Sequence, residues 1–308
     1  MITLDKFSQL HPRPEYVFTI GHLEARIALK YFPNCKVIFE GINNTDYIYD
    51  VFMNHLSELQ KFYESLIDEE SKKTFCGYWL GNVSNQFGEI VHAKGAHYFT
   101  EGFLPARGAV VIDGGVCDGG TAAKFTEFGY KVYGFEMDRE NFQMAKKVAK
   151  EKNFVLENFG LGSYKHEMKY THAPGGNVGG SKLDNEGSET AKITTIDDYV
   201  RKNKIPRVDF IKLDVEGAEL DVLRGAVTTI VMHKPILAIS AYHKWDDFWT
   251  LMDFIKSIRS DYEFALRQYT STREDEGTLF SDDTEDILYS LGLEVVLKGY
   301  NECVLLAR

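Results

Sequence analysis

The 308-residue sequence predicts an α/β fold, in which helices cover both faces of a mostly parallel sheet, with a small α/β region before it. From Gly108 onward, short apolar runs alternate with segments of helical periodicity, the pattern of strand–helix–strand units. Before that point, one isolated strand–helix–strand unit and a long amphipathic segment occur. We therefore divide the chain into an N-terminal accessory region, residues 1–100, and a main domain, residues 101–308.

In the accessory region, residues 16–20 and 36–39 are predicted strands, and a helix is predicted between them. The single Gly21 after the first strand falls far short of a dinucleotide fingerprint. Residues 47–66 place apolar side chains at helical spacing and predict one long amphipathic helix. No group of residues with catalytic chemistry stands out here, so we expect a structural or partner-binding role for this region.

The main domain begins with a strand at residues 109–112 and a helix at 121–128 that Gly129 terminates. Asp138 is a predicted N-cap for the next helix, which extends to about residue 152. Residues 192–195 lead into a short helix from Ile196. A further helix is predicted at 246–258, and the other predicted strands are residues 132–135, 154–158, 209–214, 235–241, 262–268, 285–290 and 302–307.

The segment between residues 164 and 192 contains many glycines and a proline, which predict a long loop. A long loop at the ligand end of a sheet is often a lid over a substrate. The composition is equally compatible with a solvated insertion. Both interpretations stay open from the sequence.

Composition restricts the classes of partner. The formal charge of −11 argues against a nucleic-acid surface, and no run of eighteen apolar residues predicts membrane insertion. The first residues lack the pattern of a signal peptide, and the four cysteines are scattered without metal-ligand spacing. We therefore expect a cytoplasmic protein with free thiols. The oligomeric state is not predicted.

Residues 110–121 form a strand, a glycine turn and the start of a helix. Gly115 and Gly119 allow a ligand to approach the backbone, and Asp113 lies at the tip of the strand. Glu136 follows Gly115 by 21 residues, the distance at which such folds place an acid on a ribose hydroxyl. The acids in and beside this turn would repel a pyrophosphate, whereas they suit the cationic S-adenosylmethionine. We therefore expect S-adenosylmethionine rather than NAD.

A second group of charges occurs where the strand at 209–214 opens into its helix. Lys212, Asp214 and Glu216 alternate along this strand, at the end where open α/β sheets bind ligands. We interpret Lys212 as a structural charge with a paired neighbour, and Asp214 and Glu216 as active-site acids. His243 follows the next strand and is the candidate general base, with Asp214 assisting.

Two alternatives apply to the same group. The charges could form a structural ion pair, with Glu216 and Glu219 stabilising a helix N-terminus. Asp214, Glu216 and His243 could also hold a divalent cation through oxygen and nitrogen. No spacing in the sequence requires a metal, and we do not expect one.

Taken together, these segments resemble the FkbM-type S-adenosylmethionine-dependent methyltransferases, over residues 71–308. The most specific motif is Lys-Leu-Asp-Val-Glu-Gly-Ala-Glu at residues 212–219. Other segments also match this family: the glycine turn, Val-Tyr-Gly-Phe-Glu-Met-Asp, Ile-Thr-Thr-Ile-Asp-Asp-Tyr and Leu-Ala-Ile-Ser-Ala-Tyr-His-Lys. The resemblance implies a Rossmann-like class I methyltransferase fold with a seven-stranded, mostly parallel sheet. It also implies methylation of a hydroxyl, commonly on a sugar or natural product.

The resemblance also implies which residues contact the cofactor. Glu136 takes the position of the ribose acid, and the residues around Asn158 border the adenine. Val116 stands where alanine is usual, and Met137 where proline is usual. The predicted cofactor-binding residues are Asp113, Gly115, Val116, Cys117, Gly119, Glu136, Met137, Asn158, Gly160 and Leu161.

The leading hypothesis is O-methyl transfer to a hydroxyl of a saccharide or natural product. The alternative from a different class is a binding or scaffold protein that keeps the cofactor fold without catalysis. An NAD-dependent oxidoreductase is a more distant alternative.

Overall fold

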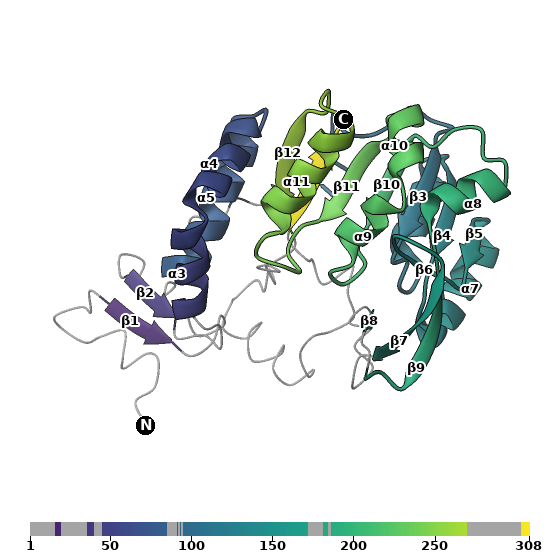
Figure 1. Cartoon of the computed structure of the whole chain (residues 1–308), viewed down its shortest axis with the longest axis horizontal. Coiled ribbons are helices and arrows are strands. Elements are labelled where there is room, and N and C mark those ends of the chain that lie inside the picture. Colours follow the sequence, from purple (N-terminus) through teal and green to yellow (C-terminus); the bar gives the residue numbers. More distant parts are fainter. Residues whose placement is uncertain are drawn as a thin grey trace, which may run out of the picture.

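The computed structural model describes residues 16–19, 36–39, 45–84, 91, 93, 95–171, 181–183, 186–269 and 303–308. Its centre is a seven-stranded sheet in the order β12-β13-β11-β10-β3-β4-β5 (Figure 1). The parallel part contains β3 (Val110–Gly114), β4 (Lys131–Phe135), β5 (Val155–Glu157), β10 (Phe210–Leu213) and β11 (Ile236–Ser240). β13 (Cys303–Ala307) is antiparallel between β11 and β12 (Phe264–Gln268). The predicted seven-stranded, mostly parallel sheet is confirmed.

The strand order determines where a ligand can bind. The chain passes from β3 through β4 to β5 in one direction, whereas β10 and β11 lie on the other side of β3. The order therefore reverses between β3 and β10. In open α/β sheets, ligands bind at such a reversal, outside the carboxyl ends of the strands.

Helices cover both faces of the sheet (Figure 1). α6 (Gly120–Glu127) and α7 (Arg139–Lys152) pack on one face, against residues such as Val111 of β3. α8 (Ile196–Lys202), α9 (Glu219–Arg224), α10 (Val227–His233) and α11 (Asp247–Ile258) share a core with Val110 and Ile112 on the other. Because side chains alternate along a strand, successive residues of β3 enter the two different cores.

Single residues in the sequence correctly predicted where some of these helices begin or end. The carboxylate of Asp138 accepts hydrogen bonds from the backbone N–H groups of Glu140 and Asn141, as its predicted N-cap role requires. Gly129, after α6, has φ of 85° and so takes the left-handed conformation expected of a C′ residue. The predicted strand at 285–290 lies outside the described residues.

The segment from 160 to 194 is not only a loop. β6 (Gly160–Leu161), β7 (His166–Thr171), β8 (Lys182–Leu183) and β9 (Glu189–Thr194) form a second sheet in the order β6-β9-β7-β8. Tyr170, Ala191 and Ile193 form its buried cluster. The prediction of one long loop over residues 164–192 was wrong at both ends, because pairing between distant strands outweighed the breakers. The glycine-rich centre, residues 172–180, lies outside the described residues.

In the N-terminal region, β1 (Tyr16–Thr19) and β2 (Lys36–Phe39) pair in parallel, as predicted. The helix predicted between them lies outside the described residues. The predicted single helix over 47–66 is two helices, α3 (Thr45–Asn54) and α4 (Leu56–Ser65). His55 breaks the helix with φ of −123°, and its ring stacks on Trp249 of α11. A tertiary contact therefore overrides the continuous periodicity.

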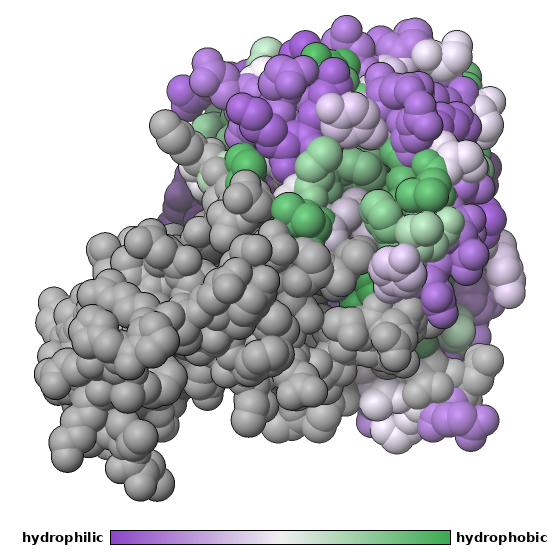
Figure 2. All heavy atoms as spheres, turned by 90° about the vertical axis from the view of Figure 1, so that its left-hand side faces the viewer, coloured by the Kyte–Doolittle hydropathy of each residue, from purple (hydrophilic) through white to green (hydrophobic). Residues whose placement is uncertain are grey.

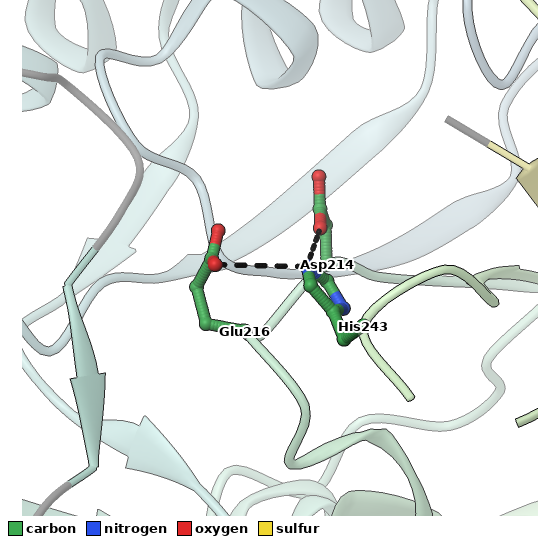
Figure 3. A group of neighbouring side chains, drawn as sticks. All are labelled: Asp214, Glu216 and His243. Carbon is green, nitrogen blue, oxygen red and sulfur yellow. Dashed lines mark ion pairs between the residues drawn. The ribbon is translucent and has the colours of Figure 1, made fainter. Parts of the chain in front are cut away.

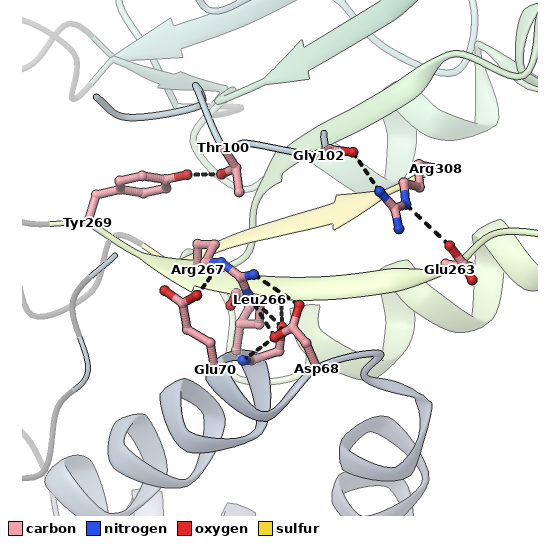
Figure 4. A network of polar contacts seen from close by, with 10 residues as sticks. Asp68, Glu70, Thr100, Gly102, Glu263, Leu266, Arg267, Tyr269 and Arg308 are labelled. Carbon is pink, nitrogen blue, oxygen red and sulfur yellow. Dashed lines mark hydrogen bonds and ion pairs between the residues drawn. The ribbon is translucent and has the colours of Figure 1, made fainter. Parts of the chain in front are cut away.

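α4 and α5 (Glu69–Ser84) pack against α11 and β12, so they share the core of the main sheet. Aromatic rings form much of this contact, including Phe62, Phe75 and Phe248. Arg267 of β12 adds a buried polar connection, since its guanidinium donates to both carboxylate oxygens of Asp68 (Figure 4). The proposed domain boundary near residue 100 stays a prediction.

Figure 2 shows the side of the molecule that lies to the left in Figure 1. Its described surface is largely hydrophilic, with apolar side chains gathered in one area. The exposed apolar side chains of α3 and α4 include Tyr49, Met53 and Leu56. In the described part of the chain, no helix is long and apolar enough to cross a membrane.

Candidate active site

The glycine turn after β3 packs directly against the end of β10. Gly115 has φ of 78°, and a Cβ added there would lie 1.7 Å from the carbonyl oxygen of Asp214. Gly119 has φ of 97° and lies against Val148 of α7. At residue 115, only glycine can adopt this positive φ and also lie so close to the backbone of Asp214. The turn therefore adjoins the strand that carries the second group of charges.

Glu136, at the end of β4, holds the turn from the other side. Its Oε2 accepts a hydrogen bond from the backbone N–H of Cys117 at 2.8 Å, and its Oε1 accepts from Asp138 at 2.8 Å. Burial raises the pKa of Glu136 to about 7, because its effect outweighs that of these two hydrogen bonds, which lower the pKa. Burial, with the charges of Asp118 and Glu136, also raises the pKa of Cys117 to about 12. The thiol is therefore protonated at neutral pH and is a poor nucleophile.

The other predicted cofactor residues gather at the same edge. The side-chain amide of Asn158 donates to the backbone carbonyl oxygens of Glu136 at 2.8 Å and Met137 at 3.3 Å. A Cβ at Gly160 would lie 3.4 Å from the Cβ of Met137, so these residues are neighbours. Leu161 reaches Gly114 of β3, and Val116 packs on Gly134 of β4.

Lys212 and Asp113 form a buried ion pair between adjacent strands. They are register partners of β10 and β3, and Nζ of Lys212 lies 3.1 Å from Oδ1 of Asp113. Lys212 also donates to the backbone carbonyl oxygens of Gly114 and Gly115. The predicted structural role of Lys212 agrees with this geometry. The side chain of Asp113 is fully buried and contacts the lysine.

Asp214, Glu216 and His243 come together at the carboxyl ends of β10 and β11 (Figure 3). Nε2 of His243 lies 3.6 Å from Oδ1 of Asp214 and 3.6 Å from Oε2 of Glu216. β10 ends at Leu213, so the alternation predicted along the strand does not carry Glu216 to this place. Glu216 instead adopts φ of 54°, followed by Gly217 at 92°, and this left-handed turn brings its carboxylate beside the imidazole.

Glu219, on the first turn of α9, orients both the turn and the histidine. Its Oε1 accepts a hydrogen bond from the backbone N–H of Val215 at 2.9 Å and lies 3.0 Å from Nδ1 of His243. Its side chain is almost completely buried. The local sequence pattern indicates only a helix terminus at Glu219, because a contact with residue 243 is not visible in local spacing.

The three carboxylates around His243 shift its titration. Burial opposes the charged ring, but Glu219, Asp214 and Glu216 outweigh it and raise the pKa of His243 to about 9. Burial and the charges of Asp214 and Glu219 raise the pKa of Glu216 to about 7. Burial alone would raise the pKa of Asp214, but Lys212, His243 and Tyr98 hold it below its ordinary value. The imidazole thus carries a positive charge at neutral pH when only these groups surround it.

Two tyrosines that were not predicted as site residues also contact Asp214. The hydroxyl of Tyr98 donates to Oδ2 of Asp214 at 2.8 Å and lies 3.0 Å from Oγ of Ser240. The hydroxyl of Tyr242 donates to Oδ1 at 3.2 Å. His97 stacks on Tyr98 with ring centroids 4.0 Å apart. Tyr242 precedes the predicted base and could have been found there, whereas nothing local marks Tyr98.

The sheet order and the similarity to a solved methyltransferase structure define the class of fold: this is a class I methyltransferase fold. The sequence matches the Methyltransferase FkbM domain family over residues 113–266, half of the chain. The chain belongs to the FkbM methyltransferase family, whose members use S-adenosylmethionine. The resemblance noted in the sequence is therefore confirmed.

Two individual relatives extend this comparison. The crystal structure of Methyltransferase FkbM from Methylobacillus flagellatus KT superposes with a TM-score of 0.67 and 21% identity. That match covers 99% of this chain and 77% of the other, and it supports the fold. The hexuronic acid methyltransferase AglP of Haloferax volcanii is 28% identical over 113 residues. This second match covers 36% of the chain and about half, 47%, of the relative.

Proposed function

We propose that this methyltransferase transfers a methyl group to a hydroxyl of a saccharide or a related natural product. The observation that carries the proposal is the contact between the cofactor turn and the acid strand. Because Gly115 lies directly on the backbone of Asp214, a ligand on the turn ends close to Asp214, Glu216 and His243. The relative that acts on hexuronic acid supports a sugar acceptor.

The residues of the turn fit S-adenosylmethionine. Each carboxylate oxygen of Glu136 accepts one backbone hydrogen bond, which leaves lone pairs for two ribose hydroxyls. Asn158, Gly160 and Leu161 border the adenine in this proposal, beside Met137. Gly115, Val116, Cys117 and Gly119 provide the backbone of the turn, and Asp113 supports it through Lys212.

When bound, S-adenosylmethionine supplies a methyl group made electrophilic by its sulfonium. The protein's part is to hold the acceptor hydroxyl close and aligned, and to remove its proton. Two arrangements of Asp214, Glu216 and His243 do this. In the arrangement predicted from the sequence, Asp214 orients His243, which accepts the proton in its neutral form. The raised pKa makes that form the minor one at neutral pH, so turnover by this arrangement would rise toward pH 9. In the other, Asp214, Glu216 and His243 would hold a cation that would lower the pKa of the hydroxyl.

A binding assay and a turnover assay test the proposal together. We expect calorimetry to detect binding of S-adenosylhomocysteine to the purified chain and none of NAD. With S-adenosylmethionine and a panel of saccharides, we expect release of S-adenosylhomocysteine. The variant His243→Gln should bind S-adenosylhomocysteine as the wild type does and turn over at least about 100-fold more slowly.

Near-normal turnover by His243→Gln would remove this residue from the mechanism. Cofactor binding without methyl transfer to any saccharide or to a cell extract would favour the alternative of a non-catalytic binding protein. Binding of NAD in place of S-adenosylhomocysteine would favour an oxidoreductase. We also keep a cytoplasmic location as part of the proposal, because Cys76 and Cys117 are free thiols.

A further inference from the structure

Nε2 of His243 is a buried polar atom that faces two carboxylates without a hydrogen bond. Its distances to Asp214 and Glu216 are both 3.6 Å, beyond hydrogen-bond length. Within the described part of the chain, this nitrogen has no other hydrogen-bond partner, although the side chain is only 10% exposed. Buried polar atoms are nearly always satisfied, so this arrangement calls for a ligand between the three groups.

The geometry points to a divalent cation: we propose that Asp214, Glu216 and His243 form a metal site. Their donor atoms all lie within 4.8 Å of one another. Two donors about 2.1 Å from one metal, at angles of about 90–110°, lie about 3.0–3.4 Å apart. The observed 3.6 Å separations therefore require only small side-chain movements to bring the donors onto one ion.

The groups behind the three donors match those that orient metal ligands. A ligating histidine usually gives its other ring nitrogen to a carboxylate, which aims the free nitrogen at the metal. Nδ1 of His243 lies 3.0 Å from the buried carboxylate of Glu219. A ligating carboxylate is usually hydrogen-bonded in turn, and Tyr98 donates to Oδ2 of Asp214 while Oδ1 faces the imidazole.

Glu216 provides a separate argument, from the backbone. Its φ of 54° is a left-handed conformation that glutamate rarely adopts. Such strain persists where the surrounding structure requires it, and it concentrates at ligand sites. Here the strained turn places Oε2 of Glu216 at 3.6 Å from Nε2 of His243 and within reach of Asp214, so the three donor groups meet at one place.

Mn²⁺ suits this site best. Carboxylates and water are the preferred ligands of Mg²⁺ and Mn²⁺, whereas imidazole favours transition metals. Two carboxylates with one imidazole therefore select Mn²⁺ over Mg²⁺. The catalytic role of the ion rests on the proposed function: the acceptor hydroxyl binds the metal, its pKa falls, and its proton passes to water. His243 then holds the ion and does not accept the proton.

To test the site, the full chain is first treated with EDTA and then titrated with Mn²⁺ alone. Electron paramagnetic resonance measures the concentration of free Mn²⁺ during the titration. We expect one Mn²⁺ per chain, and competition by Mg²⁺ at higher concentration. Glu216→Gln and His243→Gln should each weaken binding at least tenfold. Glu219→Gln, which leaves the three donor groups in place but changes the contacts of Glu219 with the imidazole and with Val215, should weaken it by about tenfold. Asp221→Asn is the matched control, because Asp221 is an exposed acid of the same corner that pairs with Arg224.

Wild-type protein without saturable Mn²⁺ binding would overturn the proposal, as would Glu216→Gln and His243→Gln proteins that bind like Asp221→Asn. Binding of S-adenosylhomocysteine by each variant checks that it is folded, and the two ligand variants provide independent readings. The titration needs neither cofactor nor acceptor. Stoichiometric Mn²⁺ binding without methyl transfer would therefore refute the proposed function alone. Methyl transfer without Mn²⁺ binding would refute the metal site alone.

Discussion

Tyr98 and Glu216 share a conformation that side chains rarely adopt. Their φ angles are 66° and 54°, and both residues lie beside Asp214. Conformations of this kind cost about 1–3 kcal/mol each. The contacts of the two side chains explain why the fold tolerates the cost here: the Tyr98 hydroxyl donates to Asp214, and the Glu216 carboxylate faces His243.

Removing the Tyr98 hydroxyl tests whether this contact orients Asp214. Tyr98→Phe keeps the ring that stacks on His97 and removes the donor to Asp214 and Ser240. We expect the free energy of unfolding to fall by about 1–3 kcal/mol, because a buried acceptor loses its partner. We also expect kcat to fall about 10- to 100-fold with little change in the acceptor KM, measured by release of S-adenosylhomocysteine.

Tyr262→Phe is the control for Tyr98→Phe. It removes another buried hydroxyl, which donates to the carbonyl oxygen of Pro235 at 2.7 Å, far from the acids. A similar loss of stability is expected, with kcat unchanged. Equal effects of the two variants on kcat would show that Tyr98 acts only through general stability.

At the scale of elements, the glycine turn between β3 and α6 places the cofactor edge against β10. Gly115→Ala adds a Cβ at 1.7 Å from the carbonyl oxygen of Asp214, so either the turn or β10 must move. We expect a loss of more than about 3 kcal/mol in unfolding free energy, or loss of S-adenosylhomocysteine binding in a protein that still folds. Chemical denaturation and calorimetry measure these two effects.

Gly108→Ala separates the clash from backbone strain. Gly108 has φ of 82°, close to the 78° of Gly115, but a Cβ there meets nothing within 4 Å. We expect this variant to lose only about 1–2 kcal/mol, the cost of a left-handed alanine, and to bind S-adenosylhomocysteine normally. Similar results for both glycines would mean that the contact with Asp214 is unimportant.

Elements with local signals were predictable, whereas those made by distant contacts were not. Asp138 and Gly129 mark helix ends through their own backbone chemistry, and both predictions hold. The break at His55 depends on a contact with Trp249, so periodicity alone predicted one helix. For the site, the acids and His243 were visible because strand ends converge, but Tyr98 arrives from a segment 116 residues before Asp214.

At the scale of the whole molecule, the N-terminal helices attach to the sheet through a polar contact as well as through aromatic packing. Burial raises the pKa of Asp68, but hydrogen bonds from Arg267 and Ser71 outweigh it and hold this pKa below the ordinary value. A carboxyl with a lowered folded pKa contributes stability above its unfolded pKa, about 3.9, and loses that contribution as the pH falls through the folded value.

Asp68→Asn should therefore destabilise the protein in a pH-dependent way. At pH 7, we expect the free energy of unfolding to fall by about 1–3 kcal/mol, since Arg267 loses a charged partner. The difference from wild type should shrink as the pH is lowered below about 4. Asp253→Asn breaks the exposed pair with Lys61 of α4 and should change stability by less than about 1 kcal/mol. A pH-independent difference for Asp68→Asn would contradict this account.

The position of β13 has a consequence for how the protein folds. β11 and β12 are not neighbours in the sheet, because residues 303–307 pair with both of them. Until that distant segment arrives, β11 has an open edge, and within the described residues no strand pairing joins β12 to β11. Assembly of this edge is a long-range, and therefore late, folding event. Chains truncated before residue 303 would expose an unpaired, apolar strand edge and tend to aggregate.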